Sequence, residues 1–180
     1  MQALGVVQQG ADILTRPAVP FDLPAEHEVA SAVVDRLLAA ASQISRVHAF
    51  AKGMGLAAPQ IGIARAAAII LPAGGDSAPI ILLNPVVTEV SEETDEQYEG
   101  CLSFFDVRGM VPRPLHLDIE HSAYDGHQTI TRFDNGLARL VAHEVDHLCG
   151  RLYTSRMRPC VQPIPVEEYR GTGQPWTTRR

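Results

Sequence analysis

The segment ARLVAHEVDHLCGRLY, residues 138–153, contains two histidines four residues apart, with a glutamate directly after the first. Residues four apart lie on one face of a helix, so the imidazoles of His143 and His147 can reach a single metal ion. Glu144 lies beside the first histidine, where its carboxylate can contact a metal-bound water without binding the ion. This H-E-x-x-H pattern is typical of metal-assisted hydrolysis, in which the cation lowers the pKa of a water and the carboxylate carries its proton.

The residues around this pattern are apolar, which predicts that the helix is largely buried. They are Leu140, Val141, Val145 and Leu148. Burying two imidazoles and a carboxylate without partners would cost on the order of several kcal/mol. The burial therefore favours a metal site over a chance match to a short motif.

Two protease patterns would take the third metal ligand from further along the chain. One uses a histidine at the position that Tyr153 occupies here, and the other uses a glutamate from a later helix. Glu167 and Glu168 lie at about that distance, but in a segment flanked by proline. Neither pattern fits the sequence well.

The three cysteines offer another source for the third ligand. Cys149 would face away from the metal on the same helix, and Cys160 lies in a proline-rich segment. Cys101, in EGCLSFF, remains. One thiolate and two imidazoles form a three-ligand site with an open fourth position, as catalytic zinc-type sites require. The other interpretation of Cys101 is a buried free thiol.

Composition limits the class of protein. The chain has 180 residues, which suits one domain with a substantial core, and 46% of them are hydrophobic. The net charge of −6 argues against nucleic acid as the main partner. We identify neither a membrane span nor a secretory signal, and an odd, low cysteine count argues against disulfides. We therefore expect a cytoplasmic enzyme domain over residues 1–180, with residues 161–180 as an extended C-terminal tail.

The elements that must position these residues can be read from periodicity. Residues 23–50 have the spacing of an amphipathic helix, and KGMGLAAPQIG (52–62) is typical of a loop whose backbone approaches something closely. Strands are predicted at 65–71, 79–85, 115–124 and 127–133, with a hairpin turn at Asp125-Gly126. The acidic part of VVTEVSEETDEQYEG (86–100) is predicted to be a solvated loop.

Asp134 or Asn135 would cap the helix of the motif, and Gly150 would end it. The order indicates an α+β domain, with antiparallel sheets around the central helix of the HEVDH motif and another helix near the N-terminus.

Three segments, GMGLAAPQ (53–60), EGCLS (99–103) and HEVDH (143–147), together resemble the signature motifs of peptide deformylases. The resemblance extends from GADILTRPA to GRLYTSRM, and the tail VEEYRGTGQPW is similar to actinobacterial members. It implies hydrolysis of the N-formyl group from the initiator methionine of nascent polypeptides, with release of formate. The implied partners are formyl-methionyl peptides of nascent chains, and the ribosome is one place where the enzyme would encounter them. Neither nucleic acid nor a membrane is an implied partner.

The resemblance also assigns roles to individual residues. Cys101, His143 and His147 match the metal ligands, for Fe²⁺ in cells, with Zn²⁺, Ni²⁺ or Co²⁺ able to substitute. A metal-bound hydroxide would attack, and Glu144 matches the general acid/base. The side-chain amide of Gln60 and the backbone N–H of Leu102 match the groups that stabilise the oxyanion.

The substrate contacts and the surroundings of the metal can be assigned in the same way. Gly55, Gly100 and Phe104 are expected to contact the substrate, Gly55 through backbone pairing as with an added strand. The motif suggests a pair between Glu99 and Arg113. Asp146 is expected to orient a ligand histidine.

The sequence departs from the family pattern at three places. Phe104-Phe105-Asp106 replaces a small apolar residue followed by proline and often glycine, Ala142 replaces glutamine, and Gly136 replaces a larger apolar residue. Adjacent residues of an extended segment point to opposite sides, so one phenylalanine should face the substrate cleft and the other the core or solvent. A diverged paralogue acting on another N-formyl or N-acyl substrate is the main alternative. A non-catalytic metal-binding or ribosome-associated module is a third, although it would need neither Glu144 nor Gln60.

Overall fold

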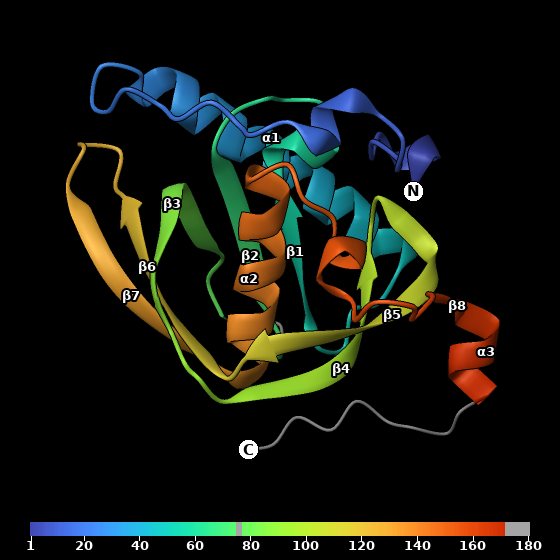
Figure 1. Cartoon of the computed structure of the whole chain (residues 1–180). Helices are drawn as coiled ribbons and strands as arrows, with labels where there is room; N and C mark the ends of the chain where they lie inside the picture. Colours follow the sequence, from blue (N-terminus) through green and yellow to red (C-terminus); the bar gives the residue numbers. More distant parts are fainter. Residues whose placement is uncertain (75–76, 172–180) are drawn as a thin grey trace.

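A five-stranded antiparallel sheet with the order β1-β2-β3-β6-β7 forms the larger layer of the molecule (Figure 1). The computed structural model describes residues 1–74 and 77–171. The strands of this sheet are β1 (Gly53–Ala57), β2 (Ala67–Pro72), β3 (Ile80–Val90), β6 (His116–Ser122) and β7 (Gln128–Asp134). The four strands predicted from apolar runs and alternation are confirmed, and in β6 Leu117 and Ile119 are the buried face, as expected. The fifth strand, β1, lies in residues 52–62, so the prediction of a loop there was wrong: its backbone pairs with β2.

The smaller sheet has three strands in the order β4-β5-β8. They are β4 (Thr94–Cys101), β5 (Phe104–Pro114) and β8 (Ile164–Pro165). A short helix, α3 (Val166–Gly171), follows β8, and four 3₁₀ turns connect other elements: η1 (Gln2–Leu4), η2 (Asp12–Thr15), η3 (Ala58–Ile61) and η4 (Tyr153–Arg156).

The central helix α2 (Asn135–Leu148) packs against strands of both sheets, and Figure 1 shows it in the middle of the molecule. It begins after Asp134 and ends before Gly150, whose φ of 70° suits glycine. Its buried residues include the apolar Val141, Val145 and Leu148, as the sequence predicted. The α+β fold with a central motif helix is confirmed.

The other long helix, α1 (His27–Val47), covers the sheet at β2. Its buried side chains recur three and four residues apart and form the larger hydrophobic cluster with residues of β1 and β2; they are Ala30, Val33, Val34, Leu37, Ala41 and Ile44. The predicted helix in residues 23–50 is therefore confirmed. No helix of the described residues is long and apolar enough to cross a membrane.

Strands β1 and β4 each lie at the end of their sheet. The main cavity of the described structure, about 860 Å³, is lined by both of them and by α2. The backbone edges of two strands therefore border the same hollow, which suits an extended peptide lying between them.

Two predictions about the surface segments were wrong. The acidic stretch is not a loop: residues 94–101 form β4, and Glu99 in it is buried. Strand pairing with β5 and ion pairs with buried arginines override the loop-like composition. The segment after residue 160 is not wholly extended, since it contains β8 and α3. Residues 172–180 of that tail, including part of the segment similar to actinobacterial members, lie outside the described residues.

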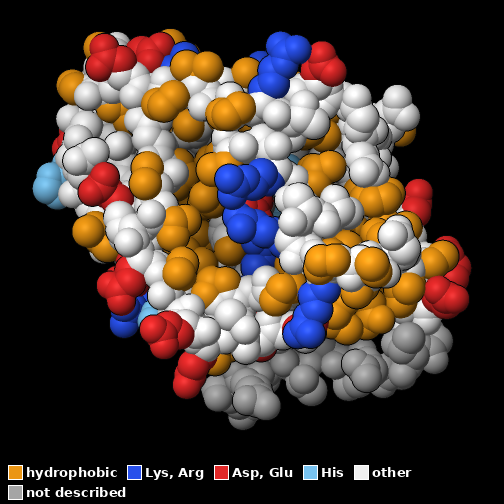
Figure 2. All heavy atoms as spheres, in the orientation of Figure 1, with side chains coloured by type: hydrophobic (Ala, Val, Ile, Leu, Met, Phe, Trp, Pro, Cys, Tyr) orange, Lys and Arg blue, Asp and Glu red, His pale blue; other side chains and the backbone are white. Residues whose placement is uncertain are grey.

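Figure 2 shows one face of the molecule in the orientation of Figure 1. Basic side chains gather in a central depression of this face, and acidic side chains lie around its periphery.

Candidate active site and metal centre

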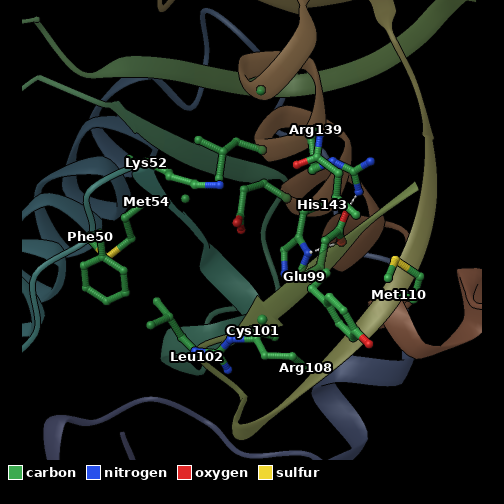
Figure 3. Close-up of a pocket in the computed structure, with 18 of the residues that line it drawn as sticks. Phe50, Lys52, Met54, Glu99, Cys101, Leu102, Arg108, Met110, Arg139 and His143 are labelled. Carbon is green, nitrogen blue, oxygen red and sulfur yellow. Dashed lines mark hydrogen bonds and ion pairs between the residues drawn. The ribbon is translucent and has the colours of Figure 1, made fainter. Parts of the chain in front are cut away.

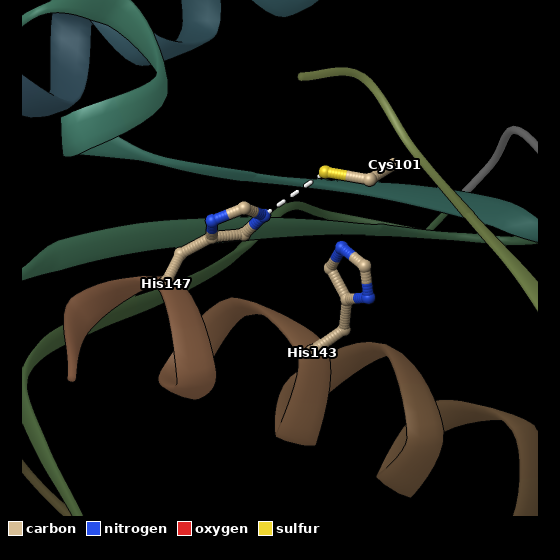
Figure 4. A group of neighbouring side chains, drawn as sticks. All are labelled: Cys101, His143 and His147. Carbon is tan, nitrogen blue, oxygen red and sulfur yellow. Dashed lines mark hydrogen bonds between the residues drawn. The ribbon is translucent and has the colours of Figure 1, made fainter. Parts of the chain in front are cut away.

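Three side chains from two elements converge at one point (Figure 4). His143 and His147 lie a turn apart on α2, and Cys101 is the last residue of β4. The ligand atoms lie within 4.8 Å of one another, and Cys101 Sγ is 3.1 Å from Nε2 of His147. All three residues are buried. The sequence prediction that these residues come together is confirmed.

The surroundings of Cys101 favour the thiolate form of its side chain. Burial alone would raise its pKa, but His147 and His143 beside it lower the pKa well below its usual value. A thiolate and two imidazoles are a donor set that zinc, iron and other borderline divalent ions accept. Cys149 and Cys160 are exposed free thiols away from this group, as expected.

Glu99 orients one of the histidines. Its Oε2 lies 3.1 Å from Nδ1 of His143, which directs the other ring nitrogen towards Cys101. The same carboxylate accepts two hydrogen bonds from Arg113, at 2.9 and 3.0 Å, and one from Arg139 at 2.6 Å. Burial would raise the pKa of Glu99, but His143 and Arg113 lower it, so the group stays ionised. The predicted Glu99–Arg113 pair is confirmed.

Asp146 does not have the role predicted for it. Its carboxylate binds Arg113 at 2.5 Å and Arg156 at 2.6 Å, and none of its hydrogen bonds goes to a ligand histidine. Asp146 therefore positions Arg113, which in turn binds Glu99. Tyr153, which replaces a ligand histidine of some proteases, stacks beside His143 with ring centroids 6.0 Å apart.

Gln60 reaches the metal centre from the 3₁₀ turn after β1. Its side-chain oxygen accepts a hydrogen bond from the Ala57 N–H at 2.9 Å, which fixes the amide orientation. Its nitrogen then points at Sγ of Cys101, 3.6 Å away, and at Oγ of Ser103, 3.3 Å away. Leu102, buried and lining the cavity, follows the cysteine directly. The two residues therefore flank the three-residue cluster.

Glu144 is buried on α2, and its Oε2 has no hydrogen-bond partner among the described residues. A buried carboxylate oxygen without a partner points to a group such as a water bound beside the three ligand atoms. Burial raises its pKa to about 7, despite the opposing effect of His143. A carboxyl with that pKa can both accept and donate a proton near neutral pH.

Two of the three residues predicted to contact the substrate line the cavity. Gly55 and Gly100 line it, but of the two phenylalanines the lining one is Phe105. Phe105 packs against His48, whereas Phe104 turns away and packs near Tyr153. One ring faces the cleft and the other the core, as expected, and the ring in the cleft is that of Phe105 and not that of Phe104. Of the other departures, Gly136 lines the cavity and Ala142, which is partly buried, packs against the hydrophobic core.

Comparison with known proteins decides the family. The profile of polypeptide deformylase matches residues 3–162. The chain belongs to the peptide deformylase family. Peptide deformylase 2 of Pseudomonas putida is 38% identical over 161 residues, which cover 85% of this chain and 86% of that protein.

Solved structures of peptide deformylases have the same fold. A class I type b peptide deformylase from Acinetobacter baumannii superposes with a TM-score of 0.74 at 31% identity, covering 85% of this chain and 97% of that one. A structure of the enzyme bound to Met-Ala-Ser gives a TM-score of 0.72 at 29% identity, over 84% and 96%. This chain is accordingly a metal-dependent hydrolase of the family that removes N-formyl groups from nascent chains.

Sequence reasoning missed several residues that line the deformylase cavity, among them Lys52, Asp95, Gln97 and Arg139. A signal for three of them was present. Asp95 and Gln97 precede Glu99 and Cys101 at intervals of two, so on one strand their side chains share a face. Arg139 lies four residues before His143, which places it on the metal-facing stripe of the helix.

Proposed function

We propose that Cys101, His143 and His147 hold one divalent ion, Fe²⁺ in the cell, with Zn²⁺, Ni²⁺ or Co²⁺ able to substitute. The observation that carries the proposal is the convergence of these donors next to the unpartnered carboxylate oxygen of Glu144. When bound, the ion supplies a Lewis acid that lowers the pKa of a coordinated water.

In the proposed reaction Glu144 takes the proton of the attacking water and gives it to the leaving amine. Its pKa of about 7 suits both transfers. As the formyl carbon becomes tetrahedral, negative charge grows on the formyl oxygen. The Gln60 amide and the Leu102 N–H are the donors that would meet this charge, an effect worth about 3–4 kcal/mol per donor in comparable sites.

The proposed substrates are formyl-methionyl peptides of nascent chains. An extended peptide between β1 and β4 would pair with backbone at Gly55 and pass Gly100. The Acinetobacter enzyme bound to Met-Ala-Ser, the product of such a reaction, supports this class. Because nascent chains are made at the ribosome, we also propose a cytoplasmic location. A single catalytic domain over residues 1–180 is proposed as well, which the match of the family model to residues 3–162 supports.

The direct test is formate release from formyl-Met-Ala-Ser by protein loaded anaerobically with Fe²⁺ or Ni²⁺. We expect turnover that disappears when the metal is removed and returns when it is restored. Acetyl-Met-Ala-Ser serves as the control, because a formyl-specific site should leave it intact. Metal-loaded protein that releases no formate would contradict the proposal.

A further inference from the structure

The turn that joins β4 to β5 is buried, although it consists of only two residues. Cys101 pairs with Phe104, and Leu102 and Ser103 form the turn between them. Both turn residues are buried, and Figure 3 shows Leu102 beside Cys101 at the cavity. Connecting segments usually lie at the surface, where water satisfies their backbone carbonyls. A buried turn needs partners for its carbonyls within the protein.

The N-terminal segment 6–9 supplies these partners. The side-chain amide of Gln8 donates to the carbonyl oxygen of Leu102 at 3.3 Å. The backbone N–H of Gln9 donates to the carbonyl oxygen of Ser103 at 2.8 Å. Figure 1 shows the N-terminal part of the chain, in blue, beside this turn. Both carbonyls of the turn are therefore held by two adjacent residues from the start of the chain.

The same segment also holds the other residue that flanks the metal centre. The backbone N–H of Val7 donates to the carbonyl oxygen of Gln60 at 2.8 Å. The amide nitrogen of Gln60 in turn lies 3.3 Å from Oγ of Ser103. Residues 6–9 thus link Gln60 to Leu102, the two residues to which the proposed function assigns the oxyanion donors. The inference that follows rests on that function.

Gln8 contributes to this link through its side chain, whereas Val7 and Gln9 contribute through the backbone. The Gln8 amide has two hydrogens to donate, and it also donates to the carbonyl oxygen of Val6 at 2.9 Å, which fixes its orientation. Val6 is buried in the hydrophobic cluster that also contains Leu102. The amide therefore projects from an anchored backbone, and a substitution of Gln8 can remove it without changing the other bonds of the segment.

We propose that Gln8 is a positioning residue for the reaction and acts through Leu102. The carbonyl that Gln8 holds and the N–H assigned to the oxyanion belong to the same residue, so a shift of one moves the other. Without the amide, the buried Leu102 carbonyl loses a partner, and the turn would move to recover one. The Leu102 N–H and the Gln60 amide would then no longer meet the formyl oxygen together, and such donors are effective only when they are already in place.

The test compares metal-loaded wild type, Gln8→Met and Gln8→Glu in formate release from formyl-Met-Ala-Ser. Methionine has about the length of glutamine, and an ionised glutamate has its shape, but neither side chain can donate a hydrogen bond. We expect each variant to lose about tenfold in kcat, with KM and metal content little changed. Gln2→Met is the matched control, because Gln2 is exposed in η1, and it should behave as wild type.

Affinity for the product Met-Ala-Ser separates positioning from general damage to the site. The product has no formyl oxygen, so its binding does not use the oxyanion donors. Its Kd should agree within about twofold between wild type and the Gln8 variants. A folded Gln8→Met or Gln8→Glu protein with the kcat of wild type would overturn the proposal while the deformylase function stands. A loss of product affinity as large as the loss of kcat would also overturn it.

A second measurement does not depend on turnover. Amide hydrogen exchange, followed by mass spectrometry of a peptide that covers residues 101–105, reports how firmly the turn is held. Exchange in this peptide should be faster by about tenfold in Gln8→Met than in wild type and Gln2→Met. Unchanged exchange would overturn the proposal. If metal-loaded wild type releases no formate, the proposed function fails, and the exchange alone decides whether Gln8 holds the turn.

Discussion

A β carbon at Gly55 would lie 2.2 Å from Oε1 of Glu144, far inside van der Waals contact. The edge strand β1 and the helix α2 therefore approach each other at the carboxylate that we assign to proton transfer. Glycine is needed here because there is no room for a side chain. Its backbone conformation does not require glycine, because the φ of Gly55 is not in the left-handed region.

Gly55→Ala should consequently move the Glu144 carboxylate and reduce kcat/KM for formyl peptides by roughly 100-fold, the scale on which small misplacements act. The ligand atoms of the metal should be unaffected. The measurement is steady-state formate release, with metal content and thermal unfolding as controls. Full activity of a folded Gly55→Ala protein would show that the carboxylate position is not critical.

Glu144→Ala and His147→Ala should fail in different ways. The first removes proton transfer and no ligand, so it should keep bound metal and lose turnover by roughly 10²–10⁴-fold. The second removes a ligand and should lose the metal itself. Metal analysis by mass spectrometry beside formate release separates the two. A Glu144→Ala protein that keeps most of its activity would refute the acid/base assignment.

Glu99 is the centre of a buried ion-pair network, and removing its charge should destabilise the fold. Glu99→Gln would leave Arg113 and Arg139 short of a counter-charge, which costs about 3–5 kcal/mol for a broken buried pair. The measurement is urea unfolding. Glu96→Gln on the same strand is the matched control, because its pair with exposed Arg158 should contribute no more than about 1 kcal/mol. Equal losses for the two variants would contradict the network's role.

Local patterns were sufficient to predict the convergence of the three donor side chains and most of the fold. His143 and His147 are fixed by helical spacing, and the strands around them by apolar runs and alternation. Cys101 followed by elimination and from the family motifs. These features depend on neighbours in the sequence, so a single sequence contains them.

What the sequence did not reveal depends on contacts between distant residues. The acidic stretch resembles a loop until Arg113 and Arg139 are placed against Asp95 and Glu99, which turns it into a cavity wall. The choice between Phe104 and Phe105 is made where the register of β4 and β5 shifts, between the pairs Glu99–Gly109 and Cys101–Phe104, and no local pattern reports such a shift. Asp146 was predicted to bind a histidine because the histidines are its neighbours in the motif. Its partner Arg156 lies on a separate 3₁₀ turn, and the sequence does not show that this turn packs against the helix.

The iron form should lose activity in air, whereas the nickel form should keep it. A thiolate ligand beside a redox-active ion is open to oxidation, and the lowered pKa of Cys101 favours the thiolate. The measurement follows formate release from both forms during incubation in aerated buffer, with mass spectrometry of the peptide containing Cys101. Equal half-lives for the two forms would contradict this explanation.

The last prediction concerns the effect of Lys52 on stability as pH changes. Burial and the like charge of Arg139 lower its pKa to about 8 in the folded protein, against an ordinary value of 10.5. Between these values the unfolded chain binds more protons at this site than the folded one, so the contribution of Lys52 to stability improves as pH rises. Below about pH 8 both states are protonated, and the full cost of holding a charge in the cavity is present.

Lys52→Met should therefore be more stable than wild type at pH 7, by a margin that shrinks as pH approaches 10. The free energy of unfolding, measured in urea at pH 7, 8.5 and 10 for both proteins, gives the margin directly. Other titrating groups are common to both proteins, so their effects cancel in the difference. Lys52→Arg is the control, because its guanidinium stays charged over this range. The difference in free energy of unfolding between Lys52→Arg and wild type should therefore change with pH only because Lys52 of the wild type loses its charge. A margin between Lys52→Met and wild type that does not change with pH would mean that Lys52 titrates as it does in solvent, and that the cavity does not perturb its charge.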